Sequence, residues 1–489
     1  MSPWAALSFA VPSVLYVASL SPYVSAWDTA EFQTVPYIFG IAHPTGFPAF
    51  IMAGWIFTHL VPLQSVAWRM GLFSALCMSL SGVTCYVLCR RLAVSPPGAC
   101  GAALLFAVGN VAWTRGTRAE VHSLAALLVV ASALFALCWY QERRPRWLVL
   151  CAVASGVGLA THPTIVLAFP GIALLVIAAR EMPSRRVIIV CLAALILPSL
   201  AYAYIPLRSH YVTAHRVDPT LALGIPPGRP YWDYGDPSTP QAFLRYVSGS
   251  DFRASASVLS LLDPRLYVRI APRAWADLTG NEFPLVALVI AAFGAVMLAV
   301  RRPLTFAGLA LALLISMPFA YGYEAEADPA RYALPAFLLI SVLVAYGVMA
   351  LAGFLAGGDR RAESATVAFA LFVLAGAEFW LQRDVLSQRF DRRFADYVDR
   401  VRQSTSADAV LVADWSYATP LAYAAFVERS LGERVVETAH PDDDRALLRK
   451  LAARKPVFVI APADVLIPGV TLRLRSAGDP NLYEVIARK

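Results

Sequence analysis

The chain has 489 residues, of which 58% are hydrophobic and 15% are charged, and its formal net charge is +8. Soluble domains carry about 25% charged residues, so a chain this apolar cannot cover a water-facing surface and is expected in a membrane. The positive charge does not indicate nucleic-acid binding, because the arginines cluster between apolar stretches. All seven cysteines lie in or beside apolar stretches, none follows Cys191, and no Cys and His spacing is typical of a zinc site.

The apolar stretches predict an all-α polytopic membrane protein with about eleven transmembrane helices. A membrane helix needs roughly 20 mainly apolar residues. The first stretch lacks a basic start, so we expect an uncleaved helix rather than a signal peptide. The predicted spans are Pro3–Leu20, Val66–Cys89, Pro97–Ala112, Val121–Tyr140, Trp147–Ala160, Thr164–Arg180, Val187–Tyr204, Pro284–Val300, Leu304–Tyr321, Ala333–Ala356 and Thr366–Leu381.

Five basic clusters in short loops predict the orientation. They are Arg90–Arg91, Glu142–Arg146, Arg185–Arg186, Arg301–Arg302 and Arg360–Arg361. With the N-terminus inside, all five fall on the cytoplasmic side, as the positive-inside rule favours. This topology requires that the apolar stretch Phe47–Pro62 does not cross the membrane, so we expect a re-entrant or interfacial helix there.

The outer side then holds the loops 21-61, 113-120, 206-283 and 322-332. It also holds the C-terminal part, 382-489, which reads as a small soluble α/β domain. The expected elements of that domain are strands at Val410–Val412 and Val457–Ile460 and helices at Pro420–Leu431 and Arg445–Arg454. The predicted division is therefore a transmembrane domain, 1-381, and an extracytoplasmic domain, 382-489.

Two carboxylates follow the first predicted span. Asp28 and Glu31 are three residues apart, so a helix would present them on one face. Carboxylates near the bilayer are costly and usually functional, and one of them can take a proton from an acceptor hydroxyl. The alternative is an interfacial helix cap, in which Asp28 caps and Glu31 closes a capping box.

A rigid turn follows the carboxylates. His43 and Pro44 lie among a glycine and a second proline, and irregular backbone at membrane depth survives only where protein or water covers it. A turn alone would not need a histidine, so His43 is a candidate site residue. The alternative is a structural connector whose histidine is only hydrogen-bonded.

Four arginines lie on the outer side, where the positive-inside rule disfavours them. They are Arg115, Arg118, Arg208 and Arg331. An anionic partner would explain them, since guanidinium suits phosphate, and a headgroup contact or salt bridge is the alternative for each. Trp232 and Tyr234 can stack on a sugar or anchor the chain at the membrane interface.

Several motifs occur together and in order. The aromatic-Asp-x-x-Glu-Phe segment Trp27–Phe32 precedes the His-Pro-x-Gly-aromatic-Pro segment His43–Pro48. Further matching stretches are Ala119–Leu124, Thr161–Pro163, Ile205–Ser209, Tyr234–Pro237, Phe243–Ser250 and Arg331–Tyr332. Together these residues resemble domain-of-unknown-function family 2723, a membrane family now placed with the GT-C glycosyltransferases alongside a eukaryotic protein O-mannosyltransferase. The resemblance is dense over the first half of the chain.

This resemblance implies an outer-face active site that uses a polyprenyl-phosphate sugar and inverts the anomeric centre. It implies Asp28 as the base, with Glu31 supporting or sharing that role. The residues that would shape the site are His43, Pro44, Glu120, His122 and His162. It implies that Arg208 or Arg331 would hold the donor phosphate. Arg118 is a further candidate for the phosphate, and Trp232, Tyr234 and Asp236 are candidates for contact with the sugar or acceptor. No cofactor is certain, and a divalent cation at Asp28 and Glu31 is left open.

The predicted function is an integral membrane glycosyltransferase. It would move a hexose, by default mannose, to a hydroxyl on an exported protein, lipid or envelope glycan, in a bacterial inner membrane and without nucleic acid. One alternative is a transporter or lipid flippase. Such a protein would line a path across the membrane with ionisable groups, whereas here the polar residues gather on one face of the membrane rather than at its midplane. The other alternative is a non-catalytic envelope assembly protein that docks a partner through 382-489.

Overall fold

The computed structural model describes residues 2–250, 258–323, 328–357, 359–439, 445–462, 467 and 469–486, so parts of the predicted loops 206-283 and 322-332 lie outside the described residues. The chain divides into two compact units. The first unit comprises Met1–Leu20, Leu72–Ala201 and Asp251–Gln388. The second unit comprises Ser21–Gly71, Tyr202–Ser250 and Arg389–Lys489. The second unit therefore gathers the first predicted outer loop, part of the long outer loop and the C-terminal segment.

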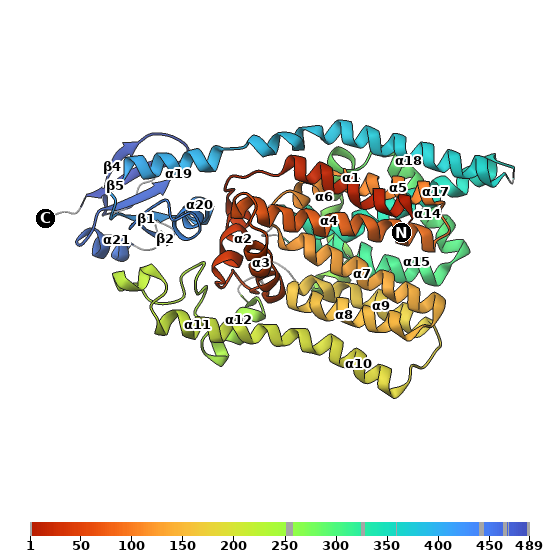
Figure 1. The fold of residues 1–489 in the computed structure, drawn as a ribbon, viewed down its shortest axis with the longest axis horizontal. Helices are drawn as coiled ribbons and strands as arrows, with labels where there is room; N and C mark the ends of the chain where they lie inside the picture. The colour runs from red at the N-terminus through yellow and green to blue at the C-terminus, as the bar shows by residue number, and fades with distance from the viewer. Residues whose placement is uncertain are drawn as a thin grey trace. The chain divides into compact units, whose positions relative to one another are not determined.

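The first unit is a bundle of helices (Figure 1). Its main helices are α1 (Pro3–Ser19), α4 (Val66–Arg91), α5 (Pro96–Ala107), α6 (Asn110–Gly116), α7 (Val121–Glu142), α8 (Pro145–Thr161), α9 (Phe169–Ala178), α10 (Arg185–Ile196), α13 (Pro264–Asp277), α14 (Leu285–Arg301), α15 (Pro303–Leu309), α16 (Ser316–Gly322), α17 (Leu334–Leu355) and α18 (Arg360–Gln382). Short helical turns join several of them, namely η1 (Pro163–Ala168), η2 (Leu197–Ala203), η5 (Val258–Leu262), η6 (Leu278–Glu282), η7 (Ala310–Leu314), η8 (Pro329–Ala333) and η9 (Arg383–Phe390).

Each of the predicted spans coincides with one helix or with consecutive helices. Within the described residues, six helices are long and apolar enough to cross a membrane, and there are up to eight if each of two bent helix pairs is one span. Helices α1, α8 and the pair η1 and α9 are apolar but shorter. The stretch expected not to span is α3 (Pro48–Leu60), whose 13 residues give a length of about 20 Å, less than the roughly 30 Å hydrocarbon core.

Glycines let two long helices of the bundle approach each other closely. A Cβ atom on Gly294 of α14 would lie 2.1 Å from the carbonyl oxygen of Leu343 in α17. A Cβ atom on Gly347 of α17 would lie 2.3 Å from the carbonyl oxygen of Ile290. Small residues at such contacts are typical of helix packing in membranes, where close backbone approach replaces the hydrophobic effect.

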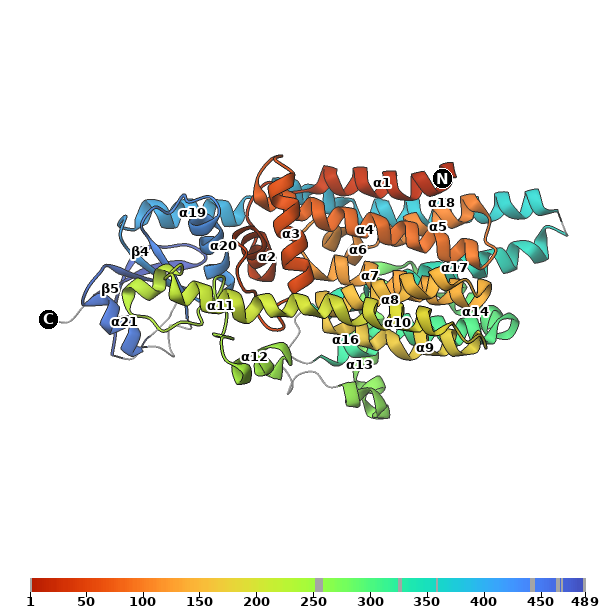
Figure 2. The ribbon, with the colours of Figure 1, turned by 60° about the horizontal axis from the view of Figure 1, so that its bottom comes forward.

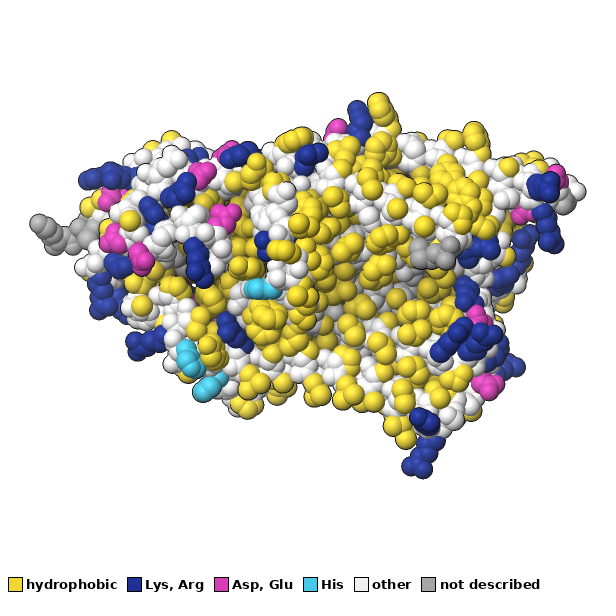
Figure 3. Space-filling model, in the orientation of Figure 1, with side chains coloured by type: hydrophobic (Ala, Val, Ile, Leu, Met, Phe, Trp, Pro, Cys, Tyr) yellow, Lys and Arg dark blue, Asp and Glu magenta, His cyan; other side chains and the backbone are white. Residues whose placement is uncertain are grey.

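The outward side chains of the bundle are apolar. None of the α10 residues is buried, and Phe369 and Trp380 of α18 are 73% and 64% exposed. In Figure 3 hydrophobic side chains cover the visible face of the first unit, and Lys and Arg side chains gather at the end that holds the turn between α17 and α18. An apolar belt this large is stable against lipid rather than water, so the chain is a multi-pass membrane protein.

The second unit combines helices with a small sheet. Its helices are α2 (Trp27–Ile38), α3, α11 (Tyr204–Ala214), η3 (Pro219–Leu223), α12 (Pro240–Val247), α19 (Arg393–Ser404), α20 (Trp415–Phe426) and α21 (Arg445–Ala452). Its strands are β1 (Val410–Ala413), β2 (Val435–Thr438), β3 (Val457–Ala461), β4 (Thr471–Ser476) and β5 (Asn481–Ile486). Figure 2 shows α2 and α3 side by side, and these two helices are in contact.

The sheet has the strand order β2-β1-β3-β5-β4. Strand β1 pairs in parallel with β2 and β3, and β5 pairs antiparallel with β3 and β4. The parallel strands are buried, because Val410 and Val457 pack in one core with Leu448 and Leu451 of α21. The strands expected around Val410 and Val457 and the helix expected at Arg445 are therefore present.

One helix predicted in this segment was wrong at both ends, because the helix expected at Pro420–Leu431 already ends at Phe426. The helix expected to begin at Pro420 begins at Trp415, five residues earlier, and includes Pro420 in its interior. Asp414 caps this helix by accepting a hydrogen bond from the backbone N–H of Tyr417. A capping aspartate stabilises a helix start, and this cap decides the boundary in place of the proline. The consequence is that Trp415 lies in the first turn of α20.

Candidate active site

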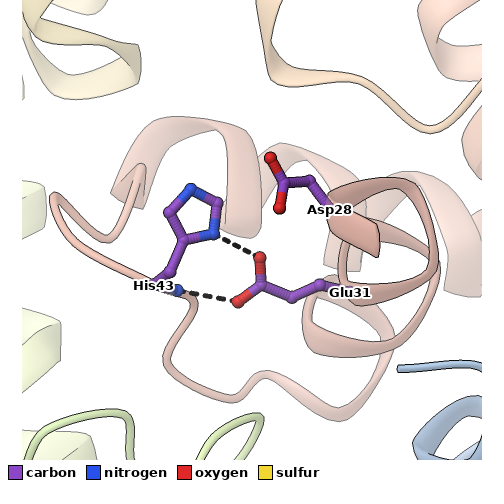
Figure 4. A group of neighbouring side chains, drawn as sticks. All are labelled: Asp28, Glu31 and His43. Atoms are coloured by element: carbon purple, nitrogen blue, oxygen red, sulfur yellow. Dashed lines mark hydrogen bonds and ion pairs between the residues drawn. The ribbon is translucent and has the colours of Figure 1, made fainter. Parts of the chain in front are cut away.

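Helix α2 carries both predicted carboxylates. Asp28 lies in its first turn, where the positive end of the helix dipole favours a negative charge, and Glu31 lies one turn later on the same face. The two differ in exposure, since the side chain of Asp28 is partly exposed whereas Glu31 is fully buried. Figure 4 shows the Asp28 carboxyl and the His43 ring both next to the Glu31 carboxyl, so the three side chains face one another.

Glu31 holds the predicted turn through His43. One carboxyl oxygen of Glu31 accepts the backbone N–H of His43 at 2.7 Å, and the other oxygen pairs with Nδ1 of the imidazole. Burial raises the pKa of Glu31, and the charge and hydrogen bonds of His43 partly offset that rise. Both oxygens of Glu31 are therefore committed to His43, whereas Asp28 is the more accessible carboxylate. Pro44, which follows His43, is buried.

Three tyrosines from residues 202–250 hold the turn in place. The backbone N–H of Ile41 donates to the carbonyl of Tyr231 at 3.1 Å, and the Tyr204 hydroxyl donates to the carbonyl of Gly40 at 3.1 Å. The Tyr246 hydroxyl donates to the carbonyl of Ala42. Gly40 permits this approach, because a Cβ atom there would lie 1.9 Å from the Tyr231 carbonyl oxygen. These contacts fix where His43, and through it Glu31, can lie.

The backbone beside the carboxylates is strained. Trp27, directly before Asp28, has a φ of 53°, and Tyr231 has a φ of 76°. Bulky residues rarely adopt positive φ, and each such conformation costs on the order of 1–3 kcal/mol. Strain of this kind collects at functional sites, where the surrounding structure over-determines the backbone.

Trp415 joins the site from the C-terminal segment. Its indole Nε1–H donates to Oδ1 of Asp28 at 3.1 Å. Its ring stacks on Tyr231, with ring centroids 5.9 Å apart and planes at 12°, and meets His43 edge-on at 6.3 Å. Trp415 was not among the predicted site residues, because the expected helix began at Pro420 and no local pattern linked position 415 to position 28. The only available signal was an aromatic residue directly after the strand at Val410.

Three site residues have the donor set of a cation site. The ligand atoms of Asp28, Glu31 and His43 all lie within 4.8 Å of one another. Carboxylate oxygens with one imidazole suit a divalent ion such as Mn²⁺. A cation bound by all three would have to compete with the contacts between Glu31 and His43, so the residues fit an ion only after that pair rearranges.

Arg208, Trp232 and Asp236 are further predicted residues of the second unit, and Trp232 lies against Arg208. Its guanidinium donates to the carbonyl of Ile38 at 3.3 Å and lies 5.8 Å from the centroid of the Trp232 ring. Its Nε is buried and has no hydrogen-bond partner within the part of the chain that the structure describes. Asp236 accepts hydrogen bonds from the hydroxyls of Ser209 and Ser238. Arg208 thus caps the C-terminal end of α2, and Asp236 stabilises the loop in which it lies.

The remaining predicted residues form a second cluster, in the first unit. Glu120 accepts hydrogen bonds from His122 Nδ1 at 2.6 Å and from Arg115 at 3.1 Å. The ring of His122 lies 4.9 Å from that of His162, and Tyr332, next to Arg331, contacts both rings. Arg115 also pairs with Asp328.

The charges of this cluster act on Glu120. Burial raises the pKa of Glu120, but the charges of His122, Arg115 and Arg331 outweigh burial and hold that pKa well below its usual range. Glu120 is therefore a fixed negative charge that organises its neighbours. Arg118 is partly exposed in the connection between α6 and α7.

Comparison with known proteins agrees with the sequence motifs. A family model described as "Protein O-mannosyl-transferase TMEM260 N-terminal domain" matches residues 28–184. The chain is 30% identical to the protein O-mannosyl-transferase tmem260 of Dictyostelium discoideum over 179 residues, which are 33% of this chain and 22% of that protein. It is 27% identical to the protein O-mannosyl-transferase TMEM260 of Mus musculus over 258 residues, 50% of this chain and 33% of that protein. The chain thus spans a third or less of the length of these curated relatives.

Solved structures show the same fold over the whole chain. The crystal structure of ArnT from Cupriavidus metallidurans bound to undecaprenyl phosphate matches with a TM-score of 0.56 and 14% identity, covering 99% of this chain and 98% of that chain. The apo structure of the same protein matches with a TM-score of 0.55. The predicted resemblance to a protein O-mannosyltransferase family is matched by the family model and the curated relatives. The chain is a multi-pass membrane protein with the fold of ArnT and a small C-terminal sheet.

Proposed function

We propose that this chain is an inverting membrane glycosyltransferase that moves a hexose, with mannose as the first choice, from a polyprenyl phosphate to a hydroxyl acceptor. The observation that carries the proposal is Asp28, a partly exposed carboxylate that starts α2 and receives the Trp415 hydrogen bond. The names of the relatives support a mannosyl transfer to protein, and the ArnT complex with undecaprenyl phosphate supports a lipid-linked donor. An exported protein is therefore the first acceptor to test, with an envelope glycan or lipid next.

Asp28 is assigned as the general base, and Glu31 as a positioning residue that holds the His43 turn beside it. Both oxygens of Glu31 are engaged by His43, and burial raises the pKa of Glu31. Asp28 is held from one side by the Trp415 indole and stays partly exposed. A hydroxyl is a weak nucleophile, so a positioned base typically contributes 10²–10⁴-fold to the rate.

The proposed reaction is a substitution at the anomeric carbon, and it needs no oxidant or reductant. The acceptor O–H bond breaks and its proton passes to the Asp28 carboxylate, while the acceptor oxygen forms a bond to the anomeric carbon. The bond between that carbon and the phosphate oxygen breaks on the opposite face, and the polyprenyl phosphate leaves with the electron pair. Inversion follows from this geometry.

The leaving phosphate needs fixed positive charge. Arg208 supports this role because its Nε is buried without a hydrogen-bond partner among the described residues and its guanidinium is braced by Trp232. Arg331 is the candidate in the first unit, because its charge acts on Glu120. Arg118, two residues before Glu120 in the sequence, is the second candidate there. Either Arg208→Gln or Arg331→Gln should raise the KM for the donor, and the variant that does so identifies the arginine that holds the phosphate.

The proposed location is a bacterial inner membrane, with the loops 21-61, 113-120, 206-283 and 322-332 and the domain 382-489 outside. Two cysteine variants test this orientation, Gln241→Cys in the long outer loop and Glu181→Cys between α9 and α10, both at exposed positions. A membrane-impermeant maleimide should label intact cells carrying the first variant and should label the second only after permeabilisation. The reverse pattern would overturn the orientation. Cys191, the one native cysteine that is not buried, is replaced by alanine in both.

Transfer itself is tested with the purified full-length chain in nanodiscs and undecaprenyl-phosphate mannose. The wild type should release undecaprenyl phosphate and mannosylate a protein or glycan acceptor, and Asp28→Asn should release almost none at an unchanged Tm. Asp408→Asn, at an exposed position of the second unit, is the matched control and should behave as wild type. A fully active Asp28→Asn would favour a scaffold or transporter instead.

A further inference from the structure

A cavity of about 380 Å³ lies in the second unit, next to Trp415. Its lining residues are Gly228, Arg229, Pro230, Tyr234, Asp414, Trp415, Thr438 and Ala439. Four of these come from the C-terminal segment and four from residues 202–250. The glycosyltransferase mechanism above uses none of the cavity's charged residues, and Tyr234 is the lining residue that the sequence predicts to contact the sugar or acceptor.

The sheet explains why a cavity forms at this point. Asp414 and Trp415 directly follow β1, and Thr438 and Ala439 end β2 and follow it. Strands β1 and β2 run in parallel, so their carboxyl ends lie at one edge of the sheet. Open α/β sheets bind ligands outside the carboxyl ends of their parallel strands, and this cavity has that position.

The lining residues suit a neutral ligand with many hydroxyl groups. Arg229 forms an ion pair at 3.1 Å with Glu437, which is fully buried, and this pair fixes the position of the guanidinium. Asp414 accepts hydrogen bonds from the Ser416 hydroxyl and the Tyr417 backbone while lining the cavity. A guanidinium donates and a carboxylate accepts, and together they can bind neighbouring hydroxyls of one ring.

Aromatic side chains supply the remaining chemistry. Tyr234 and Trp415 meet edge-to-face with ring centroids 6.0 Å apart, so the two rings form a corner at the cavity. One side of Trp415 is covered by the stacked Tyr231. The apolar face of a sugar ring packs on such aromatic surfaces, whereas the opposite charges of Arg229 and Asp414 disfavour a purely anionic or purely cationic ligand.

We propose that this cavity is a sugar subsite that binds a pyranose ring, and that Trp415 connects it to the catalytic carboxylate. The ring of Trp415 lines the cavity while its Nε1–H donates to Asp28, so an occupant lies one side chain away from the base. This inference rests on the proposed function and deepens it, because it gives the C-terminal sheet a role in substrate binding. The pyranose comes either from the donor hexosyl group or from a sugar of a glycan acceptor.

Binding is measured first, without turnover. Methyl α-mannopyranoside is titrated into the full-length chain in nanodiscs and followed by saturation-transfer NMR and intrinsic tryptophan fluorescence. We expect saturable binding that Tyr234→Leu and Asp414→Asn each weaken by about tenfold, the effect of losing one stacking or charged contact. Tyr483→Leu, in β5 and outside the cavity lining, is the control and should bind as wild type.

Steady-state kinetics then identify the source of the sugar. If the donor hexosyl group occupies the cavity, Tyr234→Leu raises the KM for undecaprenyl-phosphate mannose even when water is the acceptor. If a glycan acceptor occupies it, the same variant leaves donor hydrolysis unchanged and raises the KM for methyl α-mannopyranoside as acceptor. Either result supports the subsite.

The subsite is overturned if the wild type shows no saturable glycoside signal, or if both cavity variants bind as tightly as wild type at an unchanged Tm. Asp414→Asn keeps a side chain that can cap α20, so it tests the cavity even if Tyr234→Leu fails to fold. Arg229 is left intact, because its removal would leave the buried Glu437 charge unpaired. If the chain binds the glycoside through Tyr234 but releases no undecaprenyl phosphate, the proposed transferase function is rejected and the sugar subsite stands.

Discussion

Trp415 donates its indole N–H to the Asp28 carboxylate at 3.1 Å, although the two residues are 387 positions apart in the sequence. The C-terminal segment therefore reaches the residue that we assign as the base. A hydrogen bond to a charged group is worth more than one between neutral groups, and here the indole N–H fixes Oδ1 of Asp28.

Replacing Trp415 by phenylalanine keeps a ring and removes this hydrogen bond. We expect Trp415→Phe to lower kcat by about tenfold, the cost of one hydrogen bond to a charged group, while the KM for the donor changes little. Release of undecaprenyl phosphate from undecaprenyl-phosphate mannose measures both constants. A variant with normal kcat at an unchanged Tm would show that Trp415 does not position Asp28.

Glu31 should behave as a positioning residue. Glu31→Gln keeps one carbonyl oxygen for the backbone N–H of His43 but loses the charge opposite the imidazole. We expect kcat to fall by about 10- to 100-fold, with further loss and a lower Tm in Glu31→Ala, because a buried donor is then left unsatisfied. The pH profile of the remaining activity should keep the wild-type shape. If Glu31→Gln were instead as inactive as Asp28→Asn with normal folding, Glu31 would be the base.

Local patterns predicted much of this molecule. The helices follow from runs of apolar residues, because a membrane span must satisfy its own backbone hydrogen bonds and cover itself with apolar side chains. The carboxylate pair and His43 were also predictable, since Asp28 and Glu31 share a helix face and a Gly- and Pro-rich turn brings His43 back to them. The roles assigned to these residues stay predictions.

Long-range contacts were beyond the reach of those patterns. Trp415 and Arg229 depend on how distant segments pack, and the early start of α20 depends on the Asp414 cap rather than on Pro420. The division of the predicted site residues was also not visible. Asp28 and Arg208 belong to the second unit, whereas Glu120 and Arg331 belong to the first.

Asp233 should make stability depend on pH. Burial raises the pKa of Asp233 to about 6, from an ordinary value of 3.8. The folded state then binds the proton more tightly than the unfolded state. The stabilisation is therefore complete at acidic pH, below the ordinary value, and is lost as pH rises toward and through 6. Asp233→Asn carries no charge to bury, so its advantage in Tm over wild type should be larger at pH 7.5 than at pH 5, by about 1–3 °C.

Thermal unfolding followed by tryptophan fluorescence at the two pH values checks this prediction. Asp408→Asn, which makes the same substitution at an exposed position, is the matched control. An Asp233→Asn advantage that is equal at both pH values, or larger at pH 5, would contradict the assignment of burial as the cause.

Chelation tests whether Asp28, Glu31 and His43 act as a cation site. Their ligand atoms lie within 4.8 Å of one another, yet both oxygens of Glu31 contact His43 in the present arrangement. A cation held by all three would have to displace those contacts, so we expect release of undecaprenyl phosphate to continue unchanged in excess EDTA. Activity that disappears with EDTA and returns with Mn²⁺ or Mg²⁺ would show the opposite. In that case His43→Ala should raise the metal concentration needed for activity, because it removes the only nitrogen ligand of the three, and Glu31 would act through the ion rather than through the turn.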